Sequence, residues 1–122
     1  MNAAIVAGEH PNLIDIMGNL QAHPEQKMGL VLALIPSHYK SLGYPPSLQT
    51  CTRDTFVNAP ELHLTQIISI LKGITNVVGH LHQKGVMHGD MYAHNTLIDD
   101  KGHAILGDFG AASFTDTLDA FL

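Results

Sequence analysis

The amino-acid sequence predicts a mixed α/β (α+β) fold with a small sheet, one long helix and a following β-hairpin. The segments 13–20 and 28–35 are apolar or loosely alternating and are separated by a polar stretch, which is typical of two paired strands. Between residues 60 and 83, apolar residues recur at helical spacing: Leu64, Ile67, Ile68, Leu71, Ile74, Val78 and Leu81. Finally, the Asp-Asp-Lys-Gly turn at 99–102 separates two short apolar runs, a pattern that indicates a hairpin over residues 96–106.

The composition excludes several classes of protein. With 122 residues, 45% of them hydrophobic and 14% charged, the chain can form one modest core and is not disordered. A net charge of −5 gives no reason to expect a nucleic-acid partner. The single cysteine, Cys51, excludes an internal disulfide framework and fits a reducing compartment. With no apolar run long enough to span a bilayer and no secretory signal after Met1, we expect a cytoplasmic protein without a membrane partner. Its oligomeric state is left open.

The first third of the chain predicts a helix end and two strands. Residues 1–9 have the composition of the last turns of a helix, and Pro11 stops it because proline disfavours helix in the residue before it. Leu13 to Leu20 alternates as a strand does. The run from Met28 to Ile35 is short, apolar and followed by Pro36, so we expect a buried strand there.

The middle of the chain predicts a loop and then the long helix. Residues 36–60 hold four of the six prolines, so we expect loop with a short helix near Ser47 to Thr52. Pro60 at the first helical position and Glu61 in the first turn predict that the long helix begins there and runs to Gln83. Gly85 is placed to end it with a left-handed residue.

Three polar residues are predicted to meet at one end of the hairpin. Asp90 lies five residues before Asn95, and Asn95 lies thirteen before Asp108. The hairpin folds the chain back, so that Asp108 arrives beside Asn95. Two carboxylates and an amide oxygen are hard ligands of the kind that suit Mg²⁺, which shares its remaining positions with water and phosphates. Taken singly, each of the three is also an ordinary turn residue.

These residues resemble two motifs of the protein kinase family. The family's catalytic loop reads His-Arg-Asp, four residues and Asn, and its magnesium loop reads Asp-Phe-Gly. This chain has His-Gly-Asp at 88–90, then Asn95, then Asp-Phe-Gly at 108–110. The His-Pro-Asn-Leu stretch at 10–13 is also similar to one in kinases. The resemblance covers all 122 residues as a partial kinase domain: 1–35 the end of the N-lobe, 36–60 the hinge with its following loop, and 61–122 the start of the C-lobe.

The resemblance implies a role for each residue of the loop and hairpin. Asp90 would accept the proton of the acceptor hydroxyl, while Asn95 and Asp108 would bind Mg²⁺. His88 would belong to the catalytic loop and pack beneath Phe109, with Ile5 and Ile16 completing an apolar spine.

The resemblance also implies an ATP site. Leu32 would be the gatekeeper residue at the entrance to the hinge. Ala33 and Ile35 would offer backbone groups to the adenine, and Leu97 would form the floor beneath its ring. Read without the later motifs, the same residues are simply two core strands.

The chain departs from the family pattern in three respects. Gly89 replaces the arginine that pairs with an activation-loop phosphate, and Tyr92 replaces the lysine of serine/threonine kinases, where His94 would supply partial charge instead. The Gly-rich loop and the lysine–glutamate clamp on the phosphates have no counterpart here, the glutamate falling at about Met1. We therefore expect this 122-residue chain alone to bind nucleotide weakly and to transfer phosphate negligibly.

Three functions remain open at this point. The first is a protein kinase domain that transfers the terminal phosphoryl group of ATP to a hydroxyl of a protein substrate. The second is a small-molecule kinase of the aminoglycoside or choline type, whose loop also often reads His-Gly-Asp. The third is a non-catalytic pseudokinase module that binds partners. The Asp-Phe-Gly-Ala-Ala-Ser continuation at 108–113 favours the first.

Overall fold

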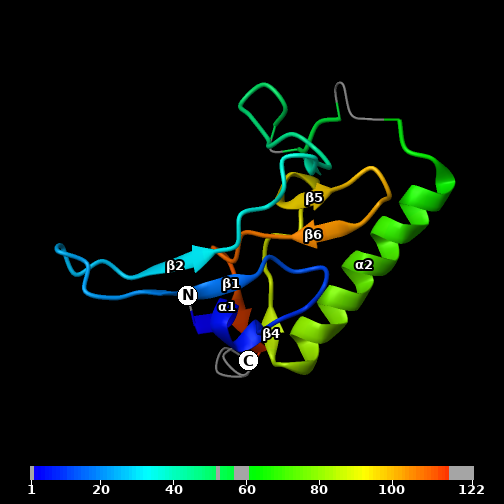
Figure 1. The fold of residues 1–122 in the computed structure, drawn as a ribbon. Helices are drawn as coiled ribbons and strands as arrows, with labels where there is room; N and C mark the ends of the chain where they lie inside the picture. Colours follow the sequence, from blue (N-terminus) through cyan, green and yellow to red (C-terminus); the bar gives the residue numbers. More distant parts are fainter. Residues whose placement is uncertain (1, 52, 57–60, 116–122) are drawn as a thin grey trace.

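The computed structural model describes residues 2–51, 53–56 and 61–115 (Figure 1). It confirms a mixed α/β fold with small antiparallel sheets and one long helix, α2 (Leu64–Gln83). Two strand pairs stand apart from the central sheet: β1 (Ile16–Leu20) with β2 (Gly29–Leu32), and β4 (Val86–Met87) with β7 (Ser113–Phe114). The central sheet has the order β3–β5–β6, and the remaining elements are these: α1 (Asn2–Ala7), β3 (Lys40–Ser41), the 3-10 turn η1 (Ala93–Asn95), β5 (Thr96–Ile98) and β6 (Ala104–Leu106).

The core lies between α2 and the β5–β6 hairpin, which lie side by side in Figure 1. One buried cluster joins α1, α2, β4 and β6 and consists of Ala3, Ala7, Leu13, Val77, Leu81, Val86 and Leu106. A smaller one joins α2 to the hairpin through Ile70, Ile98 and Ala104. The predicted hairpin over residues 96–106 is thus confirmed, and it is held from behind by the apolar face of α2. No helix in the described part of the chain has the length and apolar character needed to cross a membrane.

The long helix begins later than its proline and glutamate predict. Glu61 to His63 is not helical, and α2 starts at Leu64; Pro60 lies outside the described residues. The reason is Gln66, whose side chain accepts a hydrogen bond from the His63 N–H (2.7 Å) and donates one to the Asp100 carbonyl (2.8 Å). These contacts fix the helix end against the hairpin turn. The predicted end is confirmed, because Gly85 has a φ of 67° and closes the helix.

Gln66→Ala is expected to destabilise the fold by about 1–2 kcal/mol, because it removes a helix-capping contact and the link to the hairpin turn. Urea denaturation measures this effect. Gln83→Ala is the matched control, since it makes the same chemical change at the exposed other end of α2. Equal losses from both variants would contradict the assigned role of Gln66.

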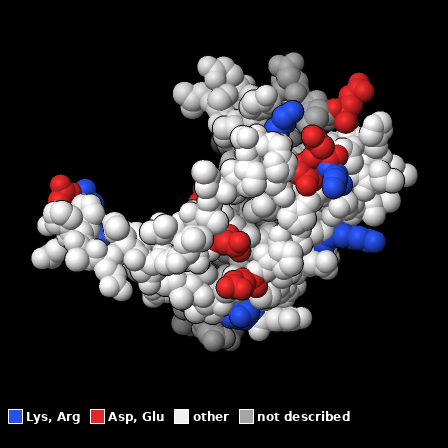
Figure 2. Space-filling model, viewed as in Figure 1, with Lys and Arg blue, Asp and Glu red and all other residues white. Residues whose placement is uncertain are grey.

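The β1–β2 hairpin projects from the rest of the chain (Figure 1, left). Its strands are shorter than predicted, and the expectation of a buried strand over Met28 to Ile35 is wrong. Met28 is 79% exposed and Leu34 is 96% exposed. Sequence periodicity reports that a segment is apolar, but burial also requires a second layer of structure, and Val31 and Leu32 of β2 remain 49% and 46% exposed. Near the tip of the hairpin, Glu25 and Lys27 form an ion pair. Figure 2 shows that charged residues of both signs are scattered over the visible face of the molecule, most of which is uncharged.

The segment after the strands runs along the central sheet. β3 pairs with β5, and Leu42 donates its N–H to the Thr96 carbonyl (2.8 Å). The short helix predicted near Ser47 to Thr52 is not formed by residues 47–51, which make a hydrogen-bonded turn, while Thr52 lies outside the described residues. Ser47 and Thr50 bond each other's backbone through their hydroxyls, and such local bonds compete with helix formation.

The N-terminal helix connects to the hairpin through the turn that follows it. As predicted, α1 ends before Pro11, with Gly8 in a left-handed conformation (φ 65°). The Asn12 side chain then donates to the Ala104 carbonyl (2.8 Å), and the Leu106 N–H donates to the Asn12 carbonyl (2.9 Å). Gly73 of α2 makes room, because an added Cβ would lie 2.7 Å from the Asn12 amide nitrogen.

Candidate active site

His88 braces the loop that carries the candidate site residues. Its side chain is buried, with 3% of the residue exposed. Its Nδ1 accepts a hydrogen bond from the Asp90 N–H (3.3 Å), so Nε2 carries the proton and donates to the Gly107 carbonyl (2.7 Å). The ring therefore ties the loop to the end of β6 and does not face solvent. Its centroid lies 5.2 Å from that of Phe109, the packing that the resemblance implies.

The structure shows contacts for only part of the expected apolar spine. Ile5 of α1 and Ile16 of β1 line one hollow between the two elements. Phe109 packs against the buried cluster that includes Ala3 and Ala7. The His88–Phe109 pair thus lies next to α1, while its continuation through Ile5 and Ile16 stays a prediction.

Asp90 and Asn95 are in direct contact. The Asn95 side-chain nitrogen donates to Oδ2 of Asp90 (3.0 Å) and to the Asp90 carbonyl (2.9 Å). These two bonds fix the amide's orientation, so that its oxygen is the atom left to face a ligand. Both residues are partly buried.

The hairpin brings Asp108 to the same end of the sheet. Thr96 pairs with Leu106, and the Gly107 N–H donates to the Asn95 carbonyl (3.0 Å), so the backbone at Asn95 adjoins the residue before Asp108. Asp108 has a left-handed φ of 53°, and its Oδ1 accepts the Gly110 N–H (3.0 Å). That bond orients the carboxylate and leaves Oδ2 available.

The donor set fits Mg²⁺ better than a transition metal. No group of three or more His, Cys, Asp and Glu side chains suited to a metal occurs in the part of the chain that the structure describes. What this end of the hairpin offers is the amide oxygen of Asn95 and the carboxylate of Asp108. Mg²⁺ is commonly held by one or two carboxylates together with water and substrate phosphates. A small number of protein ligands is therefore sufficient.

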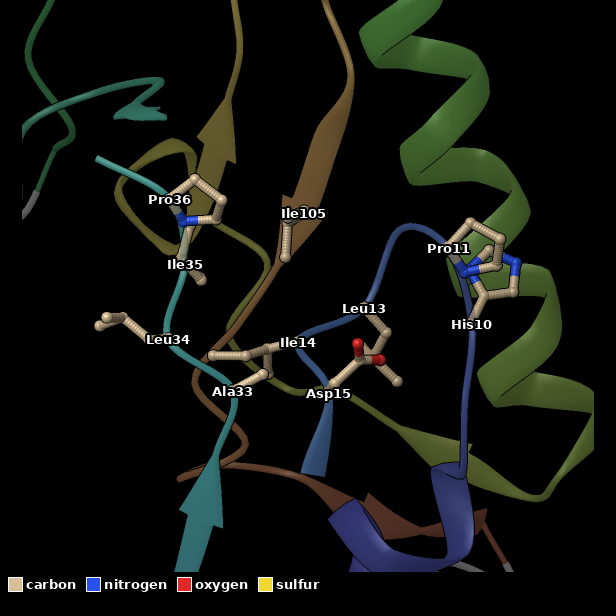
Figure 3. A pocket seen from close by; sticks show the side chains of 10 residues that line it. All are labelled: His10, Pro11, Leu13, Ile14, Asp15, Ala33, Leu34, Ile35, Pro36 and Ile105. Carbon is tan, nitrogen blue, oxygen red and sulfur yellow. The ribbon is translucent and has the colours of Figure 1, made fainter. Parts of the chain in front are cut away.

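The segment after β2 lines a small hollow (Figure 3). The Ala33 N–H donates to the Asp15 carbonyl (2.9 Å), whereas no backbone bond among the described residues uses the Ala33 carbonyl or the Ile35 N–H. The hollow measures about 150 Å³ and is lined by His10, Pro11, Leu13, Ile14, Asp15, Ala33, Leu34, Ile35, Pro36 and Ile105. Leu97 is outside this lining but pairs directly with Ile105 across the β5–β6 ladder. Leu32, the last residue of β2, is 46% exposed and also lies outside it.

His10, which lines this hollow, contacts His80 of α2. The two rings are tilted by 41° with their centroids 4.8 Å apart, and Nε2 of His80 lies 2.7 Å from the Ala7 carbonyl oxygen. Burial lowers the pKa of His10, and the nearby His80 lowers it further. A neutral His10 is therefore favoured where the turn after α1 meets α2.

Gly89 has a structural reason to replace the family's arginine. Its φ is 80°, and an added Cβ would lie 2.3 Å from the Ala111 carbonyl oxygen. No side chain fits at that distance. The backbone at Gly89 therefore lies directly against the backbone at Ala111, in the segment after Phe109. Kinases with an arginine at this position have a side chain there.

Asp54 is a site neighbour that the sequence analysis missed. It contacts His94, 40 residues further along the chain, with a distance of 2.7 Å from its Oδ1 to Nδ1 of the ring. Burial by itself would raise the pKa of Asp54, but hydrogen bonds from the His94 ring and from the backbone of His94 and Ala93 outweigh it and lower the pKa. Asp54 contacts the His94 ring and Tyr92 stacks on it, and the partial charge expected of His94 stays a prediction. No local pattern around Asp54 marks this contact.

The family model of the protein kinase domain matches residues 4–120. A serine/threonine-protein kinase US3 homolog of Gallid herpesvirus 2 (strain GA) is 40% identical over 55 residues, covering 45% of this chain and 14% of that protein. Over 112 residues, the chain is 32% identical to a putative L-type lectin-domain containing receptor kinase I.4 of Arabidopsis thaliana, covering 88% of this chain and 15% of that protein.

A third relative is more similar over a shorter stretch. The serine/threonine-protein kinase AtPK1/AtPK6 of Arabidopsis thaliana is 51% identical over 39 residues, or 32% of this chain and 8% of that protein. The chain thus spans between 8% and 15% of the length of these curated relatives. Because the family model matches nearly the whole sequence, from residue 4 to residue 120, the chain belongs to the protein kinase family.

Proposed function

We propose that this sequence is the part of an ATP-dependent protein kinase that holds the acceptor hydroxyl and the Mg²⁺ ions. The observation that carries the proposal is the position of Asn95 between the two other residues. Its side-chain amide donates a hydrogen bond to Asp90, and its backbone carbonyl accepts one from the Gly107 N–H, next to Asp108. One acidic group for the acceptor and two oxygen ligands for the metal therefore come from adjoining backbone segments. Phosphoryl transfer requires little else from the protein than positioning and charge neutralisation.

Each residue has a separate task in this proposal. Asp90 orients the acceptor hydroxyl and takes its proton as the oxygen–phosphorus bond forms and the bond to the departing ADP breaks. Asn95 and Asp108 would hold Mg²⁺, which when bound would supply positive charge to neutralise the phosphates. His88 is a positioning residue, because its ring fixes both the Asp90 N–H and the Gly107 carbonyl.

The adenine would lie against the segment that links the two halves of the chain. We propose residues 1–35 as the end of the N-lobe, 36–60 as the hinge and following loop, and 61–122 as the start of the C-lobe. The Ala33 carbonyl and the Ile35 N–H are not used by the backbone bonds of the described residues, so they are available to the base. Leu32 and Leu97 would supply apolar contacts on either side of it.

The relatives support a protein hydroxyl as the acceptor. Two of those described above are named serine/threonine-protein kinases, so we propose serine or threonine in a protein substrate. A cytoplasmic location, which the single cysteine favours, is part of the same proposal.

The binding step is tested by titration calorimetry of this chain with ATP, with and without Mg²⁺. We expect weak binding that requires the metal. Asp108→Asn is expected to weaken it at least about tenfold, because an anionic ligand of the cation is lost. Asp90→Asn is the matched control, since Asp90 serves the acceptor and its replacement keeps an oxygen for Asn95. Tight binding without Mg²⁺, or equal losses from both variants, would refute the assignment.

A further inference from the structure

Asp54 binds the short turn η1, which ends in Asn95, through two contacts with His94. Its Oδ1 lies 2.7 Å from Nδ1 of His94, and its Oδ2 accepts a hydrogen bond from the His94 backbone N–H at 3.3 Å. The two side chains are only 10% and 20% exposed, respectively. Because one carboxylate holds both the ring and the backbone of the same residue, it restrains the turn η1 as a unit.

Asp54 is itself held in place by the segment that follows the proposed hinge. Thr55, the next residue, exchanges two backbone hydrogen bonds with Tyr44, of 2.8 Å and 3.2 Å. Gly43 packs directly on η1, because an added Cβ there would lie 2.9 Å from the Cβ of Ala93. The carboxylate is therefore anchored on a segment outside the catalytic loop.

A second contact from the same segment reaches the turn. The hydroxyl of Ser41, in β3, lies 3.2 Å from the His94 carbonyl oxygen and 2.6 Å from that of Gly43. The N–H and the carbonyl of His94 are thus both engaged from outside the loop. Asn95 is the next residue, and its amide makes the two bonds to Asp90 described above.

We propose that Asp54 is a positioning residue of the active site, which acts through His94 to hold the Asn95 side chain in the orientation required by Asp90 and Mg²⁺. This inference rests on the proposed function, because it assigns Asn95 a task that depends on its orientation. It also implies that the contacts from Ser41, Gly43 and Asp54 set the geometry of the catalytic loop.

A purely structural ion pair would behave differently. Loss of such a pair lowers global stability and loosens the surrounding structure without preference for Asn95. A positioning residue instead changes the orientation of one amide, while the core around Val77 and Leu81 stays as it was. The two readings are therefore separated by a measurement at Asn95 itself.

The test is nuclear magnetic resonance of the ¹⁵N-labelled 122-residue chain with Mn²⁺ as a paramagnetic substitute for Mg²⁺. The readouts are the His94 ring proton, hydrogen exchange of the Ala93 and His94 amides, and broadening of the Asn95 side-chain signals. Asp54→Ala is expected to remove the shifted ring proton, to speed the exchange of these amides about tenfold and to reduce the Mn²⁺ broadening at Asn95. Asp54→Asn keeps an acceptor oxygen and should restore part of each signal, while Asp100→Ala, on the exposed hairpin turn, should change none.

Each outcome decides the matter. If the Asn95 signals are the same in Asp54→Ala as in Asp100→Ala, the inference is overturned. If Asp54→Ala unfolds the chain, Asp54→Asn decides: changes concentrated at 93–95 support the inference, and changes spread equally over the core overturn it. If Mn²⁺ leaves Asn95 unaffected in the unmodified chain, the proposed metal site fails, and the ring proton and exchange rates still decide whether Asp54 orients the turn.

Discussion

In the protein kinase proposed above, replacing Asp108 with asparagine is expected to lower phosphoryl transfer about a hundred- to a thousandfold, since loss of a metal ligand costs several kcal/mol of transition-state stabilisation. The amide keeps the size of the carboxylate and can still accept the Gly110 N–H through its oxygen. Asparagine also tolerates the left-handed conformation of this position, φ 53°. The variant therefore removes a charge and little else.

Asp108→Ala is the less informative substitution, although it should also be nearly inactive. Alanine at a left-handed φ adds backbone strain to the loss of the ligand. The assay is transfer of labelled phosphate from ATP to a general protein substrate, with thermal unfolding recorded for each variant. Asp100→Asn supplies the control, because it removes an exposed carboxylate from the hairpin turn. Unchanged transfer by Asp108→Asn would contradict the assignment of Asp108 as a metal ligand.

Gly89→Ala is expected to destabilise the chain by at least about 2 kcal/mol, since a residue with a Cβ pays roughly 1–2 kcal/mol at a left-handed φ before any collision. The collision is severe, because the new Cβ would lie 2.3 Å from the Ala111 carbonyl oxygen. Either the catalytic loop or the segment after Phe109 must move. We therefore also expect the His88–Phe109 packing to loosen, which the ring signals of Phe109 would report.

Gly79→Ala is a sharp control for this experiment. Gly79 lies inside α2, and an added Cβ would meet nothing within 4 Å. Both substitutions reduce the freedom of the unfolded chain equally, so that term cancels in the comparison. In urea denaturation, Gly79→Ala should stabilise the chain by about 1 kcal/mol, because alanine is the better helix former. Shifts of the same sign and size in both variants would show that the close approach at Gly89 is unimportant.

The parts of the fold that the sequence predicted depend on local patterns. The hairpin over residues 96–106 follows from one turn and two apolar runs, and its register then places Asn95 next to Gly107. The body of α2 follows from its apolar spacing. Its start was mispredicted because Pro60 and Glu61 are valid helix signals, whereas Gln66 takes its partner from Asp100, 34 residues away.

The remaining errors and omissions concern contacts that no local pattern encodes. The run from Met28 to Ile35 is apolar enough for a core strand, but its burial depends on what packs against it. Asp54 has the sequence context of an ordinary loop aspartate, and its contact with His94 crosses 40 residues. Gly89 was noted as a departure from the family, but only the position of Ala111 explains it.

The link between Asn12 and the hairpin has a consequence for how the chain is made. The Asn12 side chain bonds the carbonyl of Ala104, 92 residues further along, and Leu106 bonds the same short segment. A ribosome adds about 5–20 residues per second, so roughly 5–20 seconds separate the two partners in synthesis. During that interval α1 and Leu13 have no hairpin to pack against. The N-terminal part of the core is therefore expected to stay open until the hairpin has emerged, a period in which its apolar side chains are exposed to chaperones.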